Sequence, residues 1–180
     1  MIARAGTFTG VVLITVALLP VVALAGWALV RRSQWERAVE IGIVYGTTPW
    51  VWMIMLPGSQ AGDVPGRVSL VPLHDLIEVV EAGPVSAIGQ IGGNLLVFAA
   101  LGFLVPIRFA ALASVPRILA LAAACSMVVE TAQYAFQLDR VSSVDDVLIN
   151  AAGAGLAALA SRRWWRTYDG SGSAVRAGQF

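Results

Sequence analysis

Long apolar runs are the feature of this sequence that most limits what it can fold into. A helix needs about 20 largely apolar residues to cross a bilayer, and five stretches approach that length: 8–30, 39–57, 87–107, 115–137 and 144–161. Only 13% of the 180 residues are charged, against roughly 25% in a soluble domain. The sequence therefore predicts an all-α integral membrane helical bundle with about five transmembrane helices. Its expected location is the cell membrane, as a multi-pass protein.

The first apolar run also has features of a cleavable signal peptide. Arg4 precedes it, and the small-residue sequence Ala23-Leu24-Ala25 lies within it, which is typical of such peptides. However, the run continues through Trp27 to Arg31-Arg32, as a retained membrane-spanning helix does. We therefore expect residues 1–38 to form an N-terminal transmembrane helix and a basic cytoplasmic loop.

The rest of the chain divides into two parts. Residues 39–161 hold the other four apolar runs and are expected to form a four-helix membrane domain. Residues 162–180 are predicted to be a cytoplasmic, disordered tail, because residues 169–180 are rich in Gly and Ser. Within the outer loop 58–86, the segment 68–77 is expected to lie along the bilayer surface as a short amphipathic element.

The arginines predict the orientation, because short cytoplasmic loops collect basic residues. With the N-terminus outside and the C-terminus in the cytoplasm, nine arginines lie inside and three lie outside. The inner set is Arg31, Arg32, Arg37, Arg108, Arg117, Arg162, Arg163, Arg166 and Arg176, and the outer set is Arg4, Arg67 and Arg140.

Composition also bounds the partners. The formal charge of +1 gives no case for a nucleic-acid partner. A single cysteine, Cys125, excludes an intramolecular disulfide and a zinc site built on cysteines. The chain has no H-E-x-x-H motif and no phosphate-binding loop, and no cofactor or metal site is predicted.

Polar residues inside the apolar runs point to a site, because ionisable groups at such depth are costly. Counted from the outer turn at 1.5 Å per residue, Glu130 and Asn94 lie about 10 Å deep and Asn150 about 9 Å deep. Three helices thus present a polar residue at one level, which predicts a polar pocket open to the outer leaflet. The remaining expected site residues, above that level, are Gln133, Arg140, Ser143, Asp145 and Asp146.

Several motifs resemble the VanZ-like membrane protein family. The segment from Gly93 to Phe103 is similar to the family's N-x-x-x-F-x-P-L-G-F helix. Glu130-x-x-Gln133, then Arg140, then the run from Ser143 to Gly153 resemble its E-x-x-Q, R, D-x-x-D-x-x-x-N-x-x-G ending. The stretch Arg67-x-x-Leu70-x-Pro72-Leu73 resembles the loop before the asparagine helix.

Two positions depart from the family pattern. Ala100 replaces the usual proline, which is expected to straighten that helix. Ser143 or Ser142 occupies the place of the first acidic residue. The resemblance implies a VanZ-like domain and a role like that of the founding member, which is associated with low-level resistance to the glycopeptide teicoplanin. The implied partners are membrane lipid, a lipid-linked cell-wall precursor or a glycopeptide, reached from outside.

The sequence leaves two functions open. As an enzyme, the protein would use Glu130 as general acid or base, Arg140 to hold an anionic group, and Asp146 with Asn150 to orient substrate or a divalent ion. As a binding or protective protein, it would hold its ligand without chemistry. The lack of a nucleophile beside a base favours binding. A structural alternative also remains, in which Glu130 and Arg140 form an ion pair that closes the outer hairpin. The candidate catalytic residues are Glu130 and Asp146, and the candidate ligand-binding residues are Asn94, Gln133, Arg140, Ser143, Asp145 and Asn150.

Overall fold

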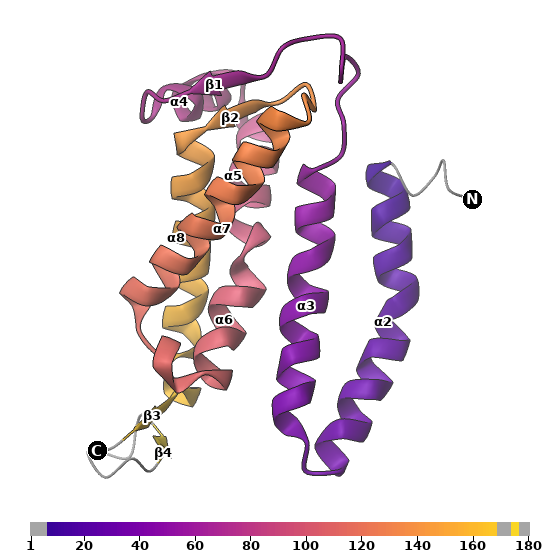
Figure 1. The fold of residues 1–180 in the computed structure, drawn as a ribbon, viewed down its shortest axis with the longest axis vertical. Helices are drawn as coiled ribbons and strands as arrows, with labels where there is room; N and C mark the ends of the chain where they lie inside the picture. The colour runs from indigo at the N-terminus through magenta and orange to yellow at the C-terminus, as the bar shows by residue number, and fades with distance from the viewer. Residues whose placement is uncertain (1–6, 169–173, 177–180) are drawn as a thin grey trace.

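The computed structural model describes residues 7–168 and 174–176, and these residues are mostly helical. The long helices run side by side between the two ends of the molecule (Figure 1). The α-helices are α2 (Phe8–Arg31), α3 (Trp35–Ile54), α4 (His74–Glu81), α5 (Pro84–Val97), α6 (Ala99–Arg108), α7 (Val115–Ala135) and α8 (Val144–Ser161). Short 3-10 helices follow α6 and α8, at Ala110–Leu112 (η1) and Arg162–Trp164 (η2).

Four helical stretches are long and apolar enough to cross a membrane. They are Phe8–Arg31, Pro84–Arg108, Val115–Ala135 and Val144–Trp164. The predicted multi-pass helical bundle is confirmed at this level. The fifth predicted run, 39–57, corresponds to α3, which is helical but is not among these four, because Glu36, Arg37 and Glu40 lie in its first two turns.

The third apolar run is interrupted at Phe98, which separates α5 from α6 and has φ −113° and ψ 16°. The expectation that Ala100 would straighten this helix is therefore wrong. The helices on both sides of the interruption pack closely against α8. A Cβ added at Gly153 would lie 2.0 Å from the Leu95 carbonyl oxygen of α5, and one added at Gly102 of α6 would lie 2.1 Å from the Ala154 carbonyl oxygen. Both half-helices thus approach α8 too closely for a side chain at either glycine.

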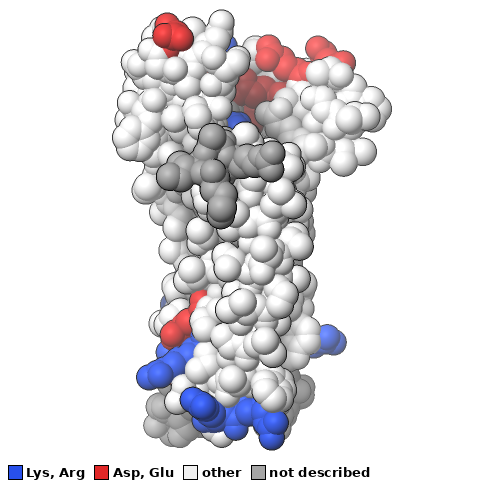
Figure 2. All heavy atoms as spheres, turned by 90° about the vertical axis from the view of Figure 1, so that its right-hand side faces the viewer, with Lys and Arg blue, Asp and Glu red and all other residues white. Residues whose placement is uncertain are grey.

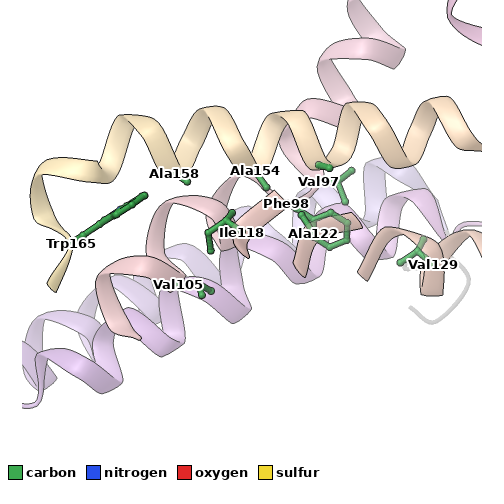
Figure 3. Packing of buried hydrophobic residues seen from close by; sticks show 10 residues of the cluster. Val97, Phe98, Val105, Ile118, Ala122, Val129, Ala154, Ala158 and Trp165 are labelled. Atoms are coloured by element: carbon green, nitrogen blue, oxygen red, sulfur yellow. The ribbon is translucent and has the colours of Figure 1, made fainter. Parts of the chain in front are cut away.

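The hydrophobic core lies where α6 and α7 meet α8. Figure 3 shows Ile118 and Ala122 of α7 in one cluster with Phe98 and with Ala154 of α8. All four are buried. Small residues on α8 permit this close approach, as is usual when membrane helices pack. The core therefore fixes the position of α8 along its axis relative to α6 and α7.

Two short parallel strands and α4 cover one end of the bundle. Strand β1 (Arg67–Ser69) pairs with β2 (Val141–Ser143), so that Arg67 lies opposite Val141 and Ser69 opposite Ser143. Helix α4 follows β1 (Figure 1). The segment 68–77, predicted as one amphipathic element, is thus divided between β1 and the start of α4. This arrangement places β2 directly before α8, at the level where α7 ends.

The other end carries the start of the tail. Trp165 is buried, and its Nε1 donates to Ser161 Oγ at 2.9 Å. Strand β3 (Arg166–Tyr168) pairs antiparallel with β4 (Ala174–Arg176). The predicted disorder of the tail stays a prediction, because residues 169–173 and 177–180 lie outside the described residues.

Candidate functional site

A cavity of about 540 Å³ opens at the end of the bundle that β1 and β2 cover. Acidic atoms gather at this end, some of them inside a notch between two lobes (Figure 2). Its walls come from α3, α5, α7 and α8 and from the turn between α7 and β2. Six of the eight predicted site residues line it: Asn94, Glu130, Gln133, Arg140, Asp146 and Asn150.

Glu130 lies in the wall of the cavity near the C-terminal end of α7. Its residue is 8% exposed, and its Oε2 accepts a hydrogen bond from the Ser143 backbone N–H at 3.1 Å. The Ser142 hydroxyl donates to the Glu130 carbonyl oxygen at 2.8 Å. Both bonds attach β2 to α7. Glu130 and Arg140 form no ion pair in the part of the chain that the structure describes, so the predicted structural ion pair is not present there.

Asp146 joins α8 to α5 across the cavity. Its Oδ1 accepts a hydrogen bond from the Asn94 side-chain amide. Glu130 and Asp146 are close enough for their charges to repel each other, and Arg140 attracts both. The Arg140 guanidinium therefore interacts electrostatically with both carboxylates, Glu130 and Asp146.

Asn150 is the most buried of the predicted site residues that line the cavity. The residue is 1% exposed, and its Nδ2 donates to the Ser126 hydroxyl at 2.8 Å. Its Oδ1 has no hydrogen-bond partner among the described residues. Buried side-chain polar atoms normally have a partner, so this oxygen is a free acceptor at the cavity wall.

Gln133 and Arg140 attach the cavity wall to the end of α3. Gln133 Nε2 donates to the Ile54 carbonyl at 2.9 Å, and Arg140 Nε donates to the Leu56 carbonyl at 3.2 Å. The two terminal nitrogens of Arg140 have no hydrogen bond within the described residues. A guanidinium oriented in this way retains two donors for an anion.

Ser143 and Asp145, also predicted as ligand-binding residues, do not line this cavity. Asp145 is 3% exposed, and its carboxylate accepts from the backbone N–H groups of Leu73 at 2.6 Å and Leu76 at 3.1 Å. The Ser143 hydroxyl accepts from the Asp145 N–H at 3.1 Å and donates to Asp75. In the structure these residues connect the start of α8 to α4, and their ligand-binding role stays a prediction.

Asp75 belongs to this connection and has a shifted pKa. Burial raises the pKa of its carboxyl group, but hydrogen bonds from Ser143, Ser69 and His74 lower it further, so that the net pKa lies below the ordinary value. Asp75 is therefore ionised at neutral pH. His74, Asp75 and Glu78 also offer metal-ligand atoms within 4.8 Å of one another. His74 and Glu78 are exposed, so this group lies at the surface of α4, outside the cavity.

The structure adds two charged residues to the cavity that the sequence analysis did not place there. Arg67 of β1 and Asp139 of the turn before β2 line the cavity and form an ion pair at 3.4 Å. Asp139 has φ 54° and accepts from the Gln60 backbone N–H at 3.1 Å. A single loop carboxylate belongs to no motif. Its position next to Arg140 in the chain is the signal that would have suggested it.

Comparison with known proteins agrees with the motifs in the sequence. Residues 43–165 match the family model described as VanZ/LLP1. The match begins within α3, includes the whole cavity apart from its Phe8 contact, and ends at the buried Trp165. No curated protein and no solved structure gives a match.

Proposed function

Because the chain belongs to the VanZ/LLP1 family, we propose that it is a membrane protein whose cavity binds the polar headgroup of a cell-envelope molecule. One observation carries this proposal: three carboxylates, two asparagines, two glutamines and two arginines, from three helices, a strand and a turn, line one cavity. Most membrane-helix surfaces bury apolar groups. A cavity that gathers so many hydrogen-bonding groups suits a ligand with charges and hydroxyls.

The proposed orientation has the N-terminus and the cavity outside and the C-terminus in the cytoplasm. In support, Figure 2 shows Arg side chains gathered at the end opposite the cavity. Positive residues mark the cytoplasmic side of membrane proteins. At that opposite end, the helix termini carry Arg31, Arg32, Arg108, Arg117, Arg162 and Arg163. By contrast, Arg67 and Arg140 line the cavity.

The same orientation makes α3 a fifth membrane span. Its two acidic residues near the cytoplasmic end are paired: Arg108 of α6 contacts Glu36 at 3.3 Å and Glu40 at 2.7 Å. Paired charges near a helix end lie at the membrane interface and cost little there. The apolar remainder of α3 then leads up to the cavity, where Ile54 accepts the Gln133 bond.

Each side chain of the cavity has a matching role in headgroup binding. The terminal nitrogens of Arg140 suit a phosphate. Glu130 and Asp146 accept from hydroxyl or ammonium groups, and Asn150 Oδ1 provides a further acceptor. A phospholipid headgroup, a lipid-linked wall precursor and a lipidated glycopeptide all offer such groups. The last two ligands would account for a protective role against glycopeptides, as the family resemblance implies.

An acid–base enzyme is the second candidate, and the burial of Glu130 beside Asp146 supports it. Glu130→Gln keeps the size of the side chain and its hydrogen-bond acceptor but removes titration. If the protein is an enzyme, this variant is made and inserted normally but loses its effect on cell-envelope lipids, measured by lipid mass spectrometry of cells with and without the protein. Unchanged function in Glu130→Gln eliminates the catalytic candidate and leaves headgroup binding.

Cysteine labelling tests the outward-facing cavity. In a Cys125→Ala background, Asn94→Cys and Asn150→Cys are treated in intact cells with a membrane-impermeant maleimide. We expect labelling from outside, and less of it when Trp replaces the neighbouring Gly89, which also lines the cavity. Labelling only after the cytoplasmic side is opened means that the orientation is reversed. Glycopeptide susceptibility of cells with and without the protein then tests the protective role.

A further inference from the structure

A second hollow, the lateral groove, adjoins the cavity on the outer face of α7. Its volume is about 380 Å³, and its walls are mostly apolar. Strand β1, helix α7 and the start of α8 form it. The lining residues are Val68, Leu70, Met127, Glu130, Thr131, Tyr134, Ser142, Ser143, Val144 and Val147.

The position of the lateral groove restricts what can occupy it. Met127 is 54% exposed and Tyr134 is 48% exposed, and both lie on α7, one of the four candidate membrane spans. A surface of a membrane span that is exposed in the monomer faces hydrocarbon. An apolar hollow at that place therefore takes a hydrocarbon chain rather than water or a polar solute.

Glu130 separates the lateral groove from the polar cavity. It lines both hollows, and its side chain receives a hydrogen bond from the Ser143 backbone N–H on the groove side. One side chain thus has polar surroundings toward the cavity and apolar surroundings toward the groove. A molecule with a polar head and an apolar chain has the same division.

The charges of the cavity indicate the type of head. Arg140 and Arg67 both line it, and Arg67 is paired with Asp139, so Arg140 is the cation available to an anion. The Asn150 Oδ1 acceptor is buried and has no partner among the described residues. A phosphate at Arg140 with a hydroxyl or amine beyond it satisfies both groups.

We propose that the ligand is a glycerophospholipid with its phosphate at Arg140, its headgroup in the cavity and one acyl chain in the lateral groove. This inference rests on the proposed headgroup binding and adds the chain and its route of entry, sideways from the membrane. A groove that faces the bilayer interior is surrounded by lipid acyl chains. These chains are therefore the most abundant apolar groups that can enter it. The junction between chain and headgroup lies at the Glu130 wall.

The test compares two tryptophan substitutions on α7. Thr131→Trp fills the lateral groove without touching the cavity, and its hydroxyl bonds only to the Met127 carbonyl of the same helix. Val128→Trp is the matched control, since Val128 is 69% exposed on α7 and lines neither hollow. Native mass spectrometry of the full chain in detergent measures binding of dioleoyl phosphatidylglycerol. Competition by deacylated glycerophosphoglycerol measures headgroup binding alone.

We expect Thr131→Trp to weaken binding of the intact lipid about tenfold, equivalent to about 1.4 kcal/mol, and to leave headgroup competition unchanged. Val128→Trp is expected to change neither, and Arg140→Gln to weaken both. If Thr131→Trp and Val128→Trp change binding of the intact lipid equally, the acyl chain does not bind in the lateral groove, whereas the proposed headgroup binding is unaffected. If neither probe binds the unsubstituted protein, the assignment of a glycerophospholipid fails. If undecaprenyl phosphate and a lipidated glycopeptide also do not bind, the proposed headgroup binding fails as well. Preferential retention of undecaprenyl phosphate over the glycerophospholipid overturns the assignment of the chain.

Discussion

The contact between α5 and α8 allows a quantitative test of the fold and of the site together. Gly153 of α8 lies so close to α5 that an added Cβ would be 2.0 Å from the Leu95 carbonyl oxygen, and ordinary van der Waals contact begins at 3.4 Å. The obstacle is backbone rather than a flexible side chain. In Gly153→Ala the two helices must therefore move apart by roughly 1.4 Å, and Asn94, next to Leu95, moves away from Asp146.

The expected cost follows from two opposing effects. Overpacking a core costs about 1–3 kcal/mol, and a clash between backbones belongs at the upper end, about 3 kcal/mol. Replacing Gly by Ala inside a helix returns about 1 kcal/mol. The net loss of about 2 kcal/mol corresponds to a Tm decrease of roughly 4–8 °C, at about 2–4 °C per kcal/mol for a chain of this size.

The assay is thermal unfolding in detergent, followed by tryptophan fluorescence, with Gly92→Ala as the control. Gly92 lies on α5 and an added Cβ there meets nothing within 4 Å, so the control gains helix propensity alone and its Tm stays the same or rises. Maleimide labelling of Asn94→Cys is expected to increase in the Gly153→Ala background as α5 separates from α8. A Gly153→Ala protein at least as stable as Gly92→Ala would refute the close packing.

Three further substitutions test the hydrogen bonds around the site. Asp145→Ala removes the acceptor for the Leu73 N–H, which holds Leu73 in a left-handed conformation at φ 67°; we expect a loss of about 1–3 kcal/mol and faster amide hydrogen exchange in α4. Because the pKa of Asp75 is lowered, its ionised form stabilises the fold above its unfolded pKa, and this contribution is lost as pH falls through the folded value. The Tm difference between the unsubstituted protein and Asp75→Asn is thus expected to be constant from about pH 8 to about pH 5 and to shrink below about pH 4. Ser126→Ala removes the acceptor of the Asn150 Nδ2 hydrogen bond. Because Asn150 Oδ1 already lacks a partner, we expect a loss of stability greater than the roughly 0.6 kcal/mol of an average membrane hydrogen bond, measured as a lower Tm.

The level of the site could be predicted from the sequence because spanning helices rise by a constant amount per residue. Counting from the predicted outer ends of their helices places Asn94, Glu130 and Asn150 at similar depth, and the structure brings all three to one cavity. The rotation of each helix could not be obtained in this way. Asp145 and Asp146 are adjacent in the sequence and face different directions, one toward α4 and the other into the cavity.

Long-range backbone contacts were also beyond the reach of sequence periodicity. Strands β1 and β2 pair although Arg67 and Val141 are 74 positions apart. Each strand has three residues, too few for an alternating pattern to be recognised. Their pairing is what brings Arg67 to Asp139. The interruption at Phe98 likewise has no signal in the sequence, because no glycine or proline stands at that position.

The serine at position 143, a departure from the family pattern, can be explained by its surroundings. Its hydroxyl accepts from the Asp145 N–H, which caps α8, and donates to the Asp75 carboxylate. An aspartate at this position would accept the first bond but has no proton to donate when ionised, and it would face Asp75 as a like charge. A carboxylate is nevertheless present beside the start of α8. It belongs to Asp75 of α4 rather than to a residue of β2, and its charge acts on Asp146. Residues 75 and 143 therefore constrain each other: an acid at both is unfavourable, and an acid at one requires a donor at the other.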